Sequence, residues 1–199
     1  VRQGLYAALL AEAGVEGAVR PFEGASGFLS KVTASHDAIA ELLERLQSRT
    51  APSRIHDTQF KRWPVGSRGQ SAIQAALQAR ASVAAPARIT EIRVMCDEEV
   101  YEHLLASRAD PWHPVSRETA DHSLPYIVAA AVLDGTIDTE SFAVERVIDP
   151  ARQAFLNAKV KVEASKTLSQ GASGGFLAKV ELTDDVGRKH VGAAAPPPG

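Results

Sequence analysis

The stretch FLAKVELTDDVGRKHV, residues 176–191, decides the fold class. Its first half alternates apolar and polar side chains, which is the two-residue period of a half-buried strand. The apolar face consists of Phe176, Ala178, Val180 and Leu182. The turn residues DDVG at 184–187 then return the chain into a second short strand at 188–191. The stretch therefore predicts a β-hairpin.

Further strands and several helices surround this hairpin in the sequence. Residues 89–96 alternate in the same way, and KVKVEAS at 159–165 alternates again. Apolar residues at helical spacing predict helices at 68–82, 98–106, 117–134, 139–147 and 150–157. Asp149 followed by Pro150 suits the start of the last of these helices. Helices combined with at least three strands and a hairpin predict an α+β fold with an antiparallel sheet.

The first 50 residues differ, because their pattern predicts helices alone. A helix at 2–13 and a second at 36–47 flank a loop at 16–27 that is rich in Gly and Pro. A polar stretch with a proline at 48–57 is the candidate domain boundary. Both helices carry apolar stripes that need a packing partner. We therefore expect aggregation or partial disorder at this end unless a partner covers it.

Composition excludes several classes of protein. The chain has 199 residues, 45% hydrophobic and 23% charged, which is ordinary for a soluble globular protein. A net charge of -2 gives no bulk attraction to nucleic acid or to anionic membranes. The single cysteine, Cys96, excludes an internal disulfide and an iron–sulfur cluster, which needs several thiolates. No Cys/His pair has zinc-site spacing, so no metal is expected, and a reducing cytoplasm is the simplest location.

One candidate site lies at FKRWPVGSRGQSAIQAALQAR, residues 60–80. Ser67 and Gln70 have capping-box spacing, so Ser67 is the predicted N-cap of the helix. Free N–H groups at a helix start suit an anion, and three cationic side chains lie close by in sequence: Lys61, Arg62 and Arg68. The pattern is compatible with a binding site for carboxylates. An ordinary helix start with solvated basic residues explains the same pattern.

A second candidate site lies at RETADHSLPYIVAAAVLDG, residues 117–135. On one helix, Arg117 could pair with Asp121, and Glu118 with His122, since each pair is four residues apart. His122 and Tyr126 would share a stripe, and Pro125 would kink the helix. Such a helix is a candidate wall of an active site. A buried helix whose polar residues satisfy one another is the alternative interpretation.

Four stretches, in order, resemble segments of the MmgE/PrpD family, which includes 2-methylcitrate dehydratase, cis-aconitate decarboxylase and iminodisuccinate epimerase. PFEGASGF at 21–28 is similar to a FEG-x-x-GF turn. FKRWP and the later GQSAIQAAL, within 60–77, are similar to a Lys-x-x-Pro segment and the helix after it. The run at 117–135 resembles the family's most recognisable signature, and PPPG at 196–199 the start of a Pro-Gly stretch.

This resemblance implies a two-domain enzyme, with an all-helical domain built from both ends of the chain and a smaller α+β lid domain between them. Residues 1–50 would end the helical domain, 51–192 would form the lid, and 193–199 would begin the return. Family members are typically homodimers without metal or organic cofactor, and their active site lies between the domains. The chain is then expected to be a C-terminal part, with the family's catalytic Asp and His upstream of Val1.

The resemblance also implies site residues. Lys61 of the Lys-x-x-Pro segment and Tyr126 of the His-Ser-x-x-Tyr segment carry over as catalytic, with His122 as a further candidate. Arg68 lies where many members have a histidine. In the expected mechanism, Lys61 and Arg68, with the helix start at Ser67 and Gln70, bind the substrate and stabilise the negative charge that develops beside a carboxylate. Tyr126 would donate a proton or hold a carboxylate.

The expected reaction of the whole enzyme is that of a hydro-lyase. It eliminates water from a tricarboxylate such as 2-methylcitrate, an intermediate of propionate metabolism. Decarboxylation of cis-aconitate and epimerisation are the alternatives within the family. An alternative from another class is a truncated lid domain without catalytic function, and the chain by itself is expected to be inactive.

Overall fold

A computed structural model of the chain describes residues 2–22, 24, 27–32, 40, 41, 44, 47, 60–171 and 176–194. The chain divides into two units, Val1–Asp57 and Thr58–Gly199. The predicted helix at 36–47 and the polar stretch at 48–57 fall largely or wholly outside the described residues, as does the PPPG end. The assignment of the units to domains of a larger enzyme stays a prediction.

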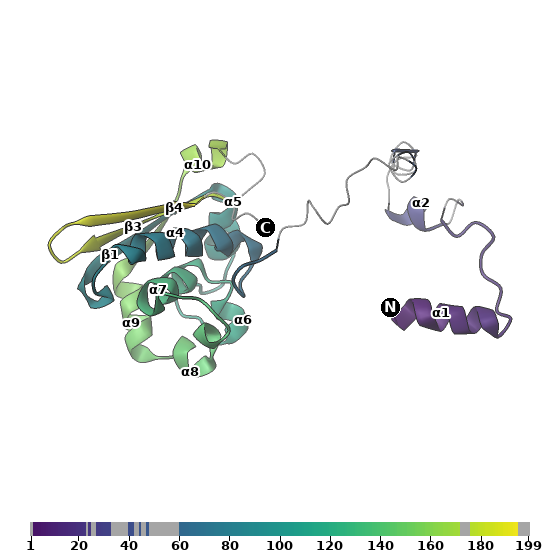
Figure 1. Ribbon diagram of the computed structural model, residues 1–199, viewed down its shortest axis with the longest axis horizontal. Coiled ribbons are helices and arrows are strands. Elements are labelled where there is room, and N and C mark those ends of the chain that lie inside the picture. Colours follow the sequence, from purple (N-terminus) through teal and green to yellow (C-terminus); the bar gives the residue numbers. More distant parts are fainter. Residues whose placement is uncertain are drawn as a thin grey trace. The chain divides into compact units, whose positions relative to one another are not determined.

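The first unit contains α1 (Arg2–Glu12) and α2 (Phe28–Val32), as Figure 1 shows. The predicted helix at 2–13 is confirmed, and Gly14 ends it with a left-handed φ of 86°. No residue of α1 is buried, and its apolar side chains are exposed, including Leu5 at 62% and Leu9 at 53%. The described part of this unit therefore leaves the apolar stripe of α1 uncovered.

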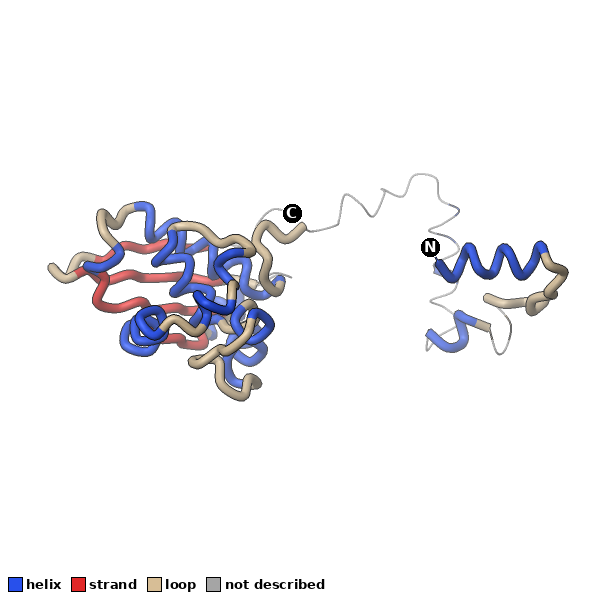
Figure 2. The backbone as a smooth tube through the Cα atoms, turned by 90° about the horizontal axis from the view of Figure 1, so that it is seen from below, coloured by secondary structure: helices blue, strands red, loops and turns tan. Residues whose placement is uncertain are grey.

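The second unit is an α+β domain with a four-stranded sheet, seen as arrows in Figure 1 and in red in Figure 2. Its strands are β1 (Ile89–Cys96), β2 (Val160–Ala164), β3 (Ala178–Asp184) and β4 (Lys189–Ala194), in the order β2-β1-β3-β4. β3 pairs antiparallel with both β1 and β4, as predicted. β2 instead runs parallel to β1, so the sheet is mixed. The long helical connection between β1 and β2 is the crossover that a parallel pair requires.

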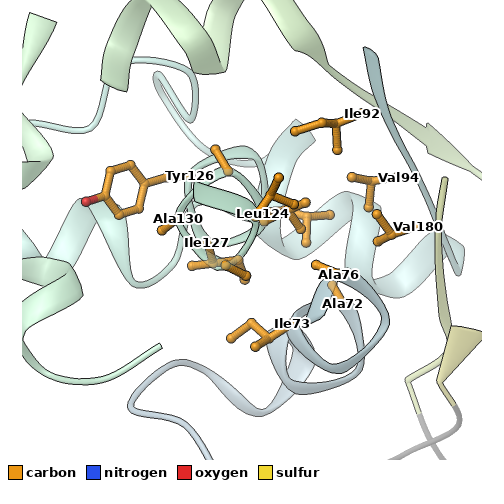
Figure 3. Close-up of a cluster of buried hydrophobic side chains, with 14 of the residues drawn as sticks. Ala72, Ile73, Ala76, Ile92, Val94, Leu124, Tyr126, Ile127, Ala130 and Val180 are labelled. Atoms are coloured by element: carbon orange, nitrogen blue, oxygen red, sulfur yellow. The ribbon is translucent and has the colours of Figure 1, made fainter. Parts of the chain in front are cut away.

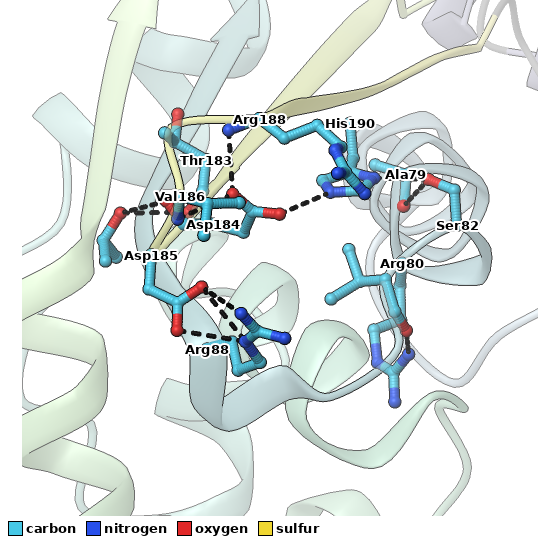
Figure 4. A network of polar contacts seen from close by, with 12 residues as sticks. Ala79, Arg80, Ser82, Arg88, Thr183, Asp184, Asp185, Val186, Arg188 and His190 are labelled. Carbon is cyan, nitrogen blue, oxygen red and sulfur yellow. Dashed lines mark hydrogen bonds and ion pairs between the residues drawn. The ribbon is translucent and has the colours of Figure 1, made fainter.

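The predicted hairpin is confirmed, and its turn is tied to the end of a helix (Figure 4). The Asp184 carboxylate accepts hydrogen bonds from Val186 N at 3.1 Å and Arg188 N at 2.8 Å. Gly187 takes a left-handed φ of 77°, which closes the turn. His190 links the hairpin to the end of α4 (Gln70–Ala81), because its Nδ1 lies 2.9 Å from Ser82 Oγ and its Nε2 3.4 Å from Asp184 Oδ2. Burial raises the pKa of Asp184, but these hydrogen bonds outweigh it and lower the pKa overall.

Apart from α10 (Lys166–Gly171), which the sequence did not predict, the helices of this unit occur where the sequence predicts them, with one exception. They are α4 (Gln70–Ala81), α5 (Glu98–Tyr101), α6 (Arg117–Ala120), α7 (Leu124–Asp134), α8 (Val144–Val147), α9 (Pro150–Lys159) and α10 (Lys166–Gly171). Short turns of other helix types stand at Ser67–Gly69, Pro86–Arg88, Glu102–Ala106 and Glu140–Phe142. Asp149 caps α9 through Ala151 N at 2.8 Å, as predicted.

The exception is the single kinked helix predicted at 117–134, which is wrong. The chain forms two helices, α6 and α7, with a break at residues 121–123. Ser123 starts α7 by accepting a hydrogen bond from Tyr126 N at 3.1 Å. Pro125 lies in the first turn of α7, where its missing N–H costs nothing, so it causes no kink.

The core lies between the sheet and the helices α4, α7 and α9, which cover one face of it (Figure 2). Every residue from Leu124 to Val132 of α7 is buried. In Figure 3, Leu124 and Ile127 of α7 point toward the sheet and α4, whereas Tyr126 points away from them. The opposite face of the sheet is charged, with ion pairs such as Lys189–Glu181 at 2.8 Å. Within the described residues, no helix has the length and apolar character needed to cross a membrane.

Candidate active site

An open hollow of about 560 Å3 lies at one side of the second unit. One wall is the segment that precedes α4, and the other is the loop that follows α7. The lining residues are Lys61, Arg62, Trp63, Pro64, Ile137, Asp138 and Thr139. The hollow therefore brings the first candidate site of the sequence together with a loop that comes directly after the second.

A buried side chain fixes the first wall. Gln70, only 3% exposed, accepts hydrogen bonds at its Oε1 from Arg62 N at 3.0 Å and Trp63 N at 3.1 Å. Its Nε2 donates to Trp63 O at 2.9 Å and Val65 O at 3.4 Å. The side-chain amide thus pairs with the backbone of this segment much as a neighbouring strand would. Gln70 holds the wall in place and makes no contact with the hollow.

The capping box predicted from Ser67 and Gln70 is wrong. Ser67 opens a short 3-10 turn, the capping position is Gly66, and neither that turn nor α4 has a side-chain cap. Gln70 instead uses its whole amide on the segment before it. Ser67 is exposed at the surface and, like Gln70, lies outside the lining of the hollow.

Two adjacent cations belong to the hollow. Lys61 and Arg62 are both exposed, and neither forms an ion pair within the described part of the chain. The Arg62 guanidinium lies 5.1 Å from the centroid of the Trp63 ring, so that ring supports it from one side. Trp63 itself is 8% exposed and anchors the segment in the core. The wall therefore offers two positive charges to an anionic ligand.

The second wall rests on a chain of hydrogen bonds that starts in the core. Tyr126 donates from its hydroxyl to Ser141 O at 2.7 Å. Ser141 in turn donates from N and Oγ to Asp138 Oδ1, at 3.1 and 3.3 Å, and its Oγ accepts from Asp138 N at 3.1 Å. These bonds fix the turn that presents Asp138 and Thr139 to the hollow.

Tyr126 itself lies behind this wall. It is 1% exposed, and its ring centroid is 6.1 Å from that of Phe142. Burial raises the pKa of its phenol, while the charge of Arg152 acts in the opposite direction. In this conformation its hydroxyl reaches the hollow only through Ser141 and Asp138.

His122 lies elsewhere, because the break between α6 and α7 separates it from the Tyr126 face. The common stripe predicted for the two residues is therefore wrong. The His122 Nδ1 contacts the Asp121 carboxylate and lies 3.7 Å from Glu118 Oε1, which confirms the predicted pairing with Glu118. A Cβ added to Gly66 would be 3.7 Å from His122 Cδ2, so the ring packs against that glycine.

Asp121 thus pairs with its neighbour His122, and no ion pair joins it to Arg117 among the described residues. Ligand atoms of Glu118, Asp121 and His122 lie within 4.8 Å of one another. Their closeness follows from spacings of one, three and four residues at the end of a helical turn, with Glu118 84% exposed. This grouping does not by itself indicate a metal site.

Arg68 is also occupied away from the hollow. Its Nη2 forms an ion pair with Glu99 Oε1 at 2.7 Å, and its guanidinium lies 5.2 Å from the centroid of the Phe176 ring. Of the residues that the sequence singles out, the structure therefore places Lys61 in the hollow, and Gln70 and Tyr126 behind its two walls. It places His122, Arg68 and Ser67 outside the lining.

Comparison with known proteins supports the resemblance seen in the sequence. The family model of the MmgE/PrpD C-terminal domain matches residues 63–199. The chain belongs to the MmgE/PrpD family. No curated protein matches it significantly. The family match begins at Trp63 and so includes both α4 and the loop after α7, but Lys61 and Arg62 lie just outside it.

Within this MmgE/PrpD domain, sequence reasoning missed the second wall of the hollow. Ile137, Asp138 and Thr139 follow Gly135, which ends α7 with a left-handed φ of 71°. The signal was present, because Asp138 and Ser141 have the three-residue spacing of a polar turn. Nothing in that spacing shows that the turn faces Lys61 and Arg62.

Proposed function

We propose that the hollow binds carboxylates of a tricarboxylate, in a hydro-lyase of the 2-methylcitrate dehydratase type. The observation that carries the proposal is the pair of exposed cations, Lys61 and Arg62, on a wall that the buried Gln70 holds rigidly. Membership of the MmgE/PrpD family supports a lyase or a related enzyme. Two exposed positive charges that form no ion pair with the described residues suit a ligand with several negative charges.

In the proposed elimination, a base removes a proton beside a carboxylate, and negative charge then builds up on that carboxylate. Lys61 and Arg62 are placed to stabilise this charge. Arg62 takes the place that the sequence favoured for Arg68, because Arg68 is paired with Glu99. The base is expected from the helical domain that the resemblance implies. Tyr126 could donate a proton only after its hydroxyl leaves Ser141 O.

Three other functions remain proposals beside this one. Decarboxylation of cis-aconitate and epimerisation would use the same cations, since both build negative charge beside a carboxylate. A lid without catalytic function is favoured by a different observation, which is the burial of Tyr126 behind the wall.

We also propose a cofactor-free homodimer, and light scattering of the purified protein would test the dimer.

Isothermal titration of the chain with 2-methylcitrate and with cis-aconitate tests the proposal. We expect both ligands to bind, and Lys61→Ala to weaken each by about 5–10-fold, as for loss of one charged contact near the surface. Lys166→Ala is the matched control, because this exposed lysine of α10 lies outside the hollow. Equal losses in the two variants would refute the site.

The same samples should then be assayed for turnover. We expect none from the chain alone, and dehydration of 2-methylcitrate when the helical domain of a family member is supplied. Turnover of cis-aconitate to a decarboxylated product would replace the hydro-lyase proposal with the decarboxylase. Binding without turnover under every condition would favour the non-catalytic lid.

A further inference from the structure

A carboxylate lines the same hollow as the two cations. Asp138 belongs to the lining, and only its Oδ1 is engaged, by N and Oγ of Ser141. Its Oδ2 forms no hydrogen bond or ion pair with any residue that the structure describes. Tyr126 fixes the turn from behind through Ser141 O. The hollow is therefore lined by a carboxylate on a hydrogen-bonded turn, with one oxygen unengaged by any described residue, as well as by two cations.

We propose that Asp138 determines specificity by selecting tricarboxylates that carry a hydroxyl group. This inference rests on the proposed function, since it assumes that Lys61 and Arg62 bind the ligand's carboxylates. An ionised carboxylate can only accept hydrogen bonds, so the free Oδ2 suits a hydroxyl donor. The negative charge of Asp138 also repels a ligand that would place a carboxylate, instead of a hydroxyl, next to Oδ2.

The contact selects the substrate and takes no part in protonating the leaving group. Elimination of water requires a proton donor at the departing hydroxyl, and an ionised carboxylate supplies none. The inference separates the candidate reactions, because a hydro-lyase substrate of this kind has the hydroxyl and cis-aconitate lacks it. Asp138 would therefore favour binding of the hydroxylated substrate over binding of its dehydrated product.

Citrate and tricarballylate form a matched pair of probes, because they differ only in the central hydroxyl. Titration calorimetry at one pH and salt concentration should show that the chain binds citrate about 5–10-fold more tightly than tricarballylate. Asp138→Asn keeps an oxygen for the Ser141 bonds but turns the free atom into an N–H donor. We expect this variant to lose the preference and to bind tricarballylate more tightly than the unchanged chain does.

The control variant is Glu140→Gln, which removes an exposed negative charge two residues away that does not line the hollow. It should keep the preference for citrate, which separates the hydroxyl contact from a general effect of charge. Equal affinity of the unchanged chain for citrate and tricarballylate would overturn the role of Asp138 and leave the tricarboxylate site standing. If neither probe binds, the proposed function fails and the inference fails with it.

Discussion

Replacing Gln70 with leucine tests whether the cationic wall is held by one buried amide. Leucine is similar in size to glutamine, so it still fills the core, but it removes all four hydrogen bonds to Arg62, Trp63 and Val65. Arg62 is exposed, so its N–H can bond to water instead. Trp63, whose side chain is 8% exposed, would lose the partner of its N–H, whereas its carbonyl would keep the bond from Val65 N at 2.8 Å.

The expected cost follows from these partners. Each lost bond is worth about 1 kcal/mol, and a buried group left unsatisfied costs about 1–3 kcal/mol. We therefore expect Gln70→Leu to lower the free energy of unfolding by about 2–4 kcal/mol. For a chain of this size the melting temperature should fall by about 5–15 °C.

The assay should follow the wall itself as well as global stability. The chain has two tryptophans, so a Trp112→Phe background makes the emission of Trp63 a direct report on the segment. Gln78→Leu is the control, because Gln78 is exposed on the same helix. We expect Gln70→Leu to shift the Trp63 emission to longer wavelength and to weaken citrate binding. A stability within about 0.5 kcal/mol of the Gln78→Leu control would refute the reasoning.

Four other predictions concern buried groups of the second unit. Gly192→Ala should cost about 3 kcal/mol or more in chemical denaturation, because the added Cβ would overlap the Ala75 carbonyl oxygen and lie 2.8 Å from Ala79 N; wild-type stability would show that α4 does not pack this closely on β4. Tyr126→Phe should cost about 1–3 kcal/mol by leaving Ser141 O unpaired, and an unchanged melting temperature would contradict the bond. Burial, with the charge of Asp97, raises the pKa of Cys96 to about 12, so a thiol reagent at pH 8 should label it only as fast as the chain unfolds. The unfolded thiol ionises near pH 9 and the folded one does not, so stability should fall as the pH rises above about 9.

The sheet was largely predictable from sequence because its signals are local. The alternation in β1 and β3 marks the faces, and the turn at Asp184–Gly187 sets the hairpin. The direction of β2 was not predictable in this way, because its residues alternate identically in either direction. Only the length and path of the helical crossover make β2 parallel to β1.

The break between α6 and α7 shows a different limit of prediction from sequence. Helical spacing runs without interruption through 117–134, so periodicity alone favours one helix. The competing signal was the capping residue Ser123 followed by Pro125, which starts a new helix more readily than it kinks an old one. This choice decides the site, because it turns His122 away from Tyr126.

The positions of Gln70 and Tyr126 lead to a common conclusion about how the hollow works. Each residue sits behind a wall and acts through backbone groups, Gln70 through Trp63 and Tyr126 through Ser141. A loss of activity after changing either residue therefore does not show that it touches the substrate. For Tyr126, positioning the wall and contacting the ligand directly predict different results. A positioning role makes its effect on ligand affinity depend on Asp138, so the effects of Tyr126→Phe and Asp138→Asn on citrate affinity should not add. Independent effects would instead mean that the hydroxyl leaves Ser141 and reaches the ligand directly.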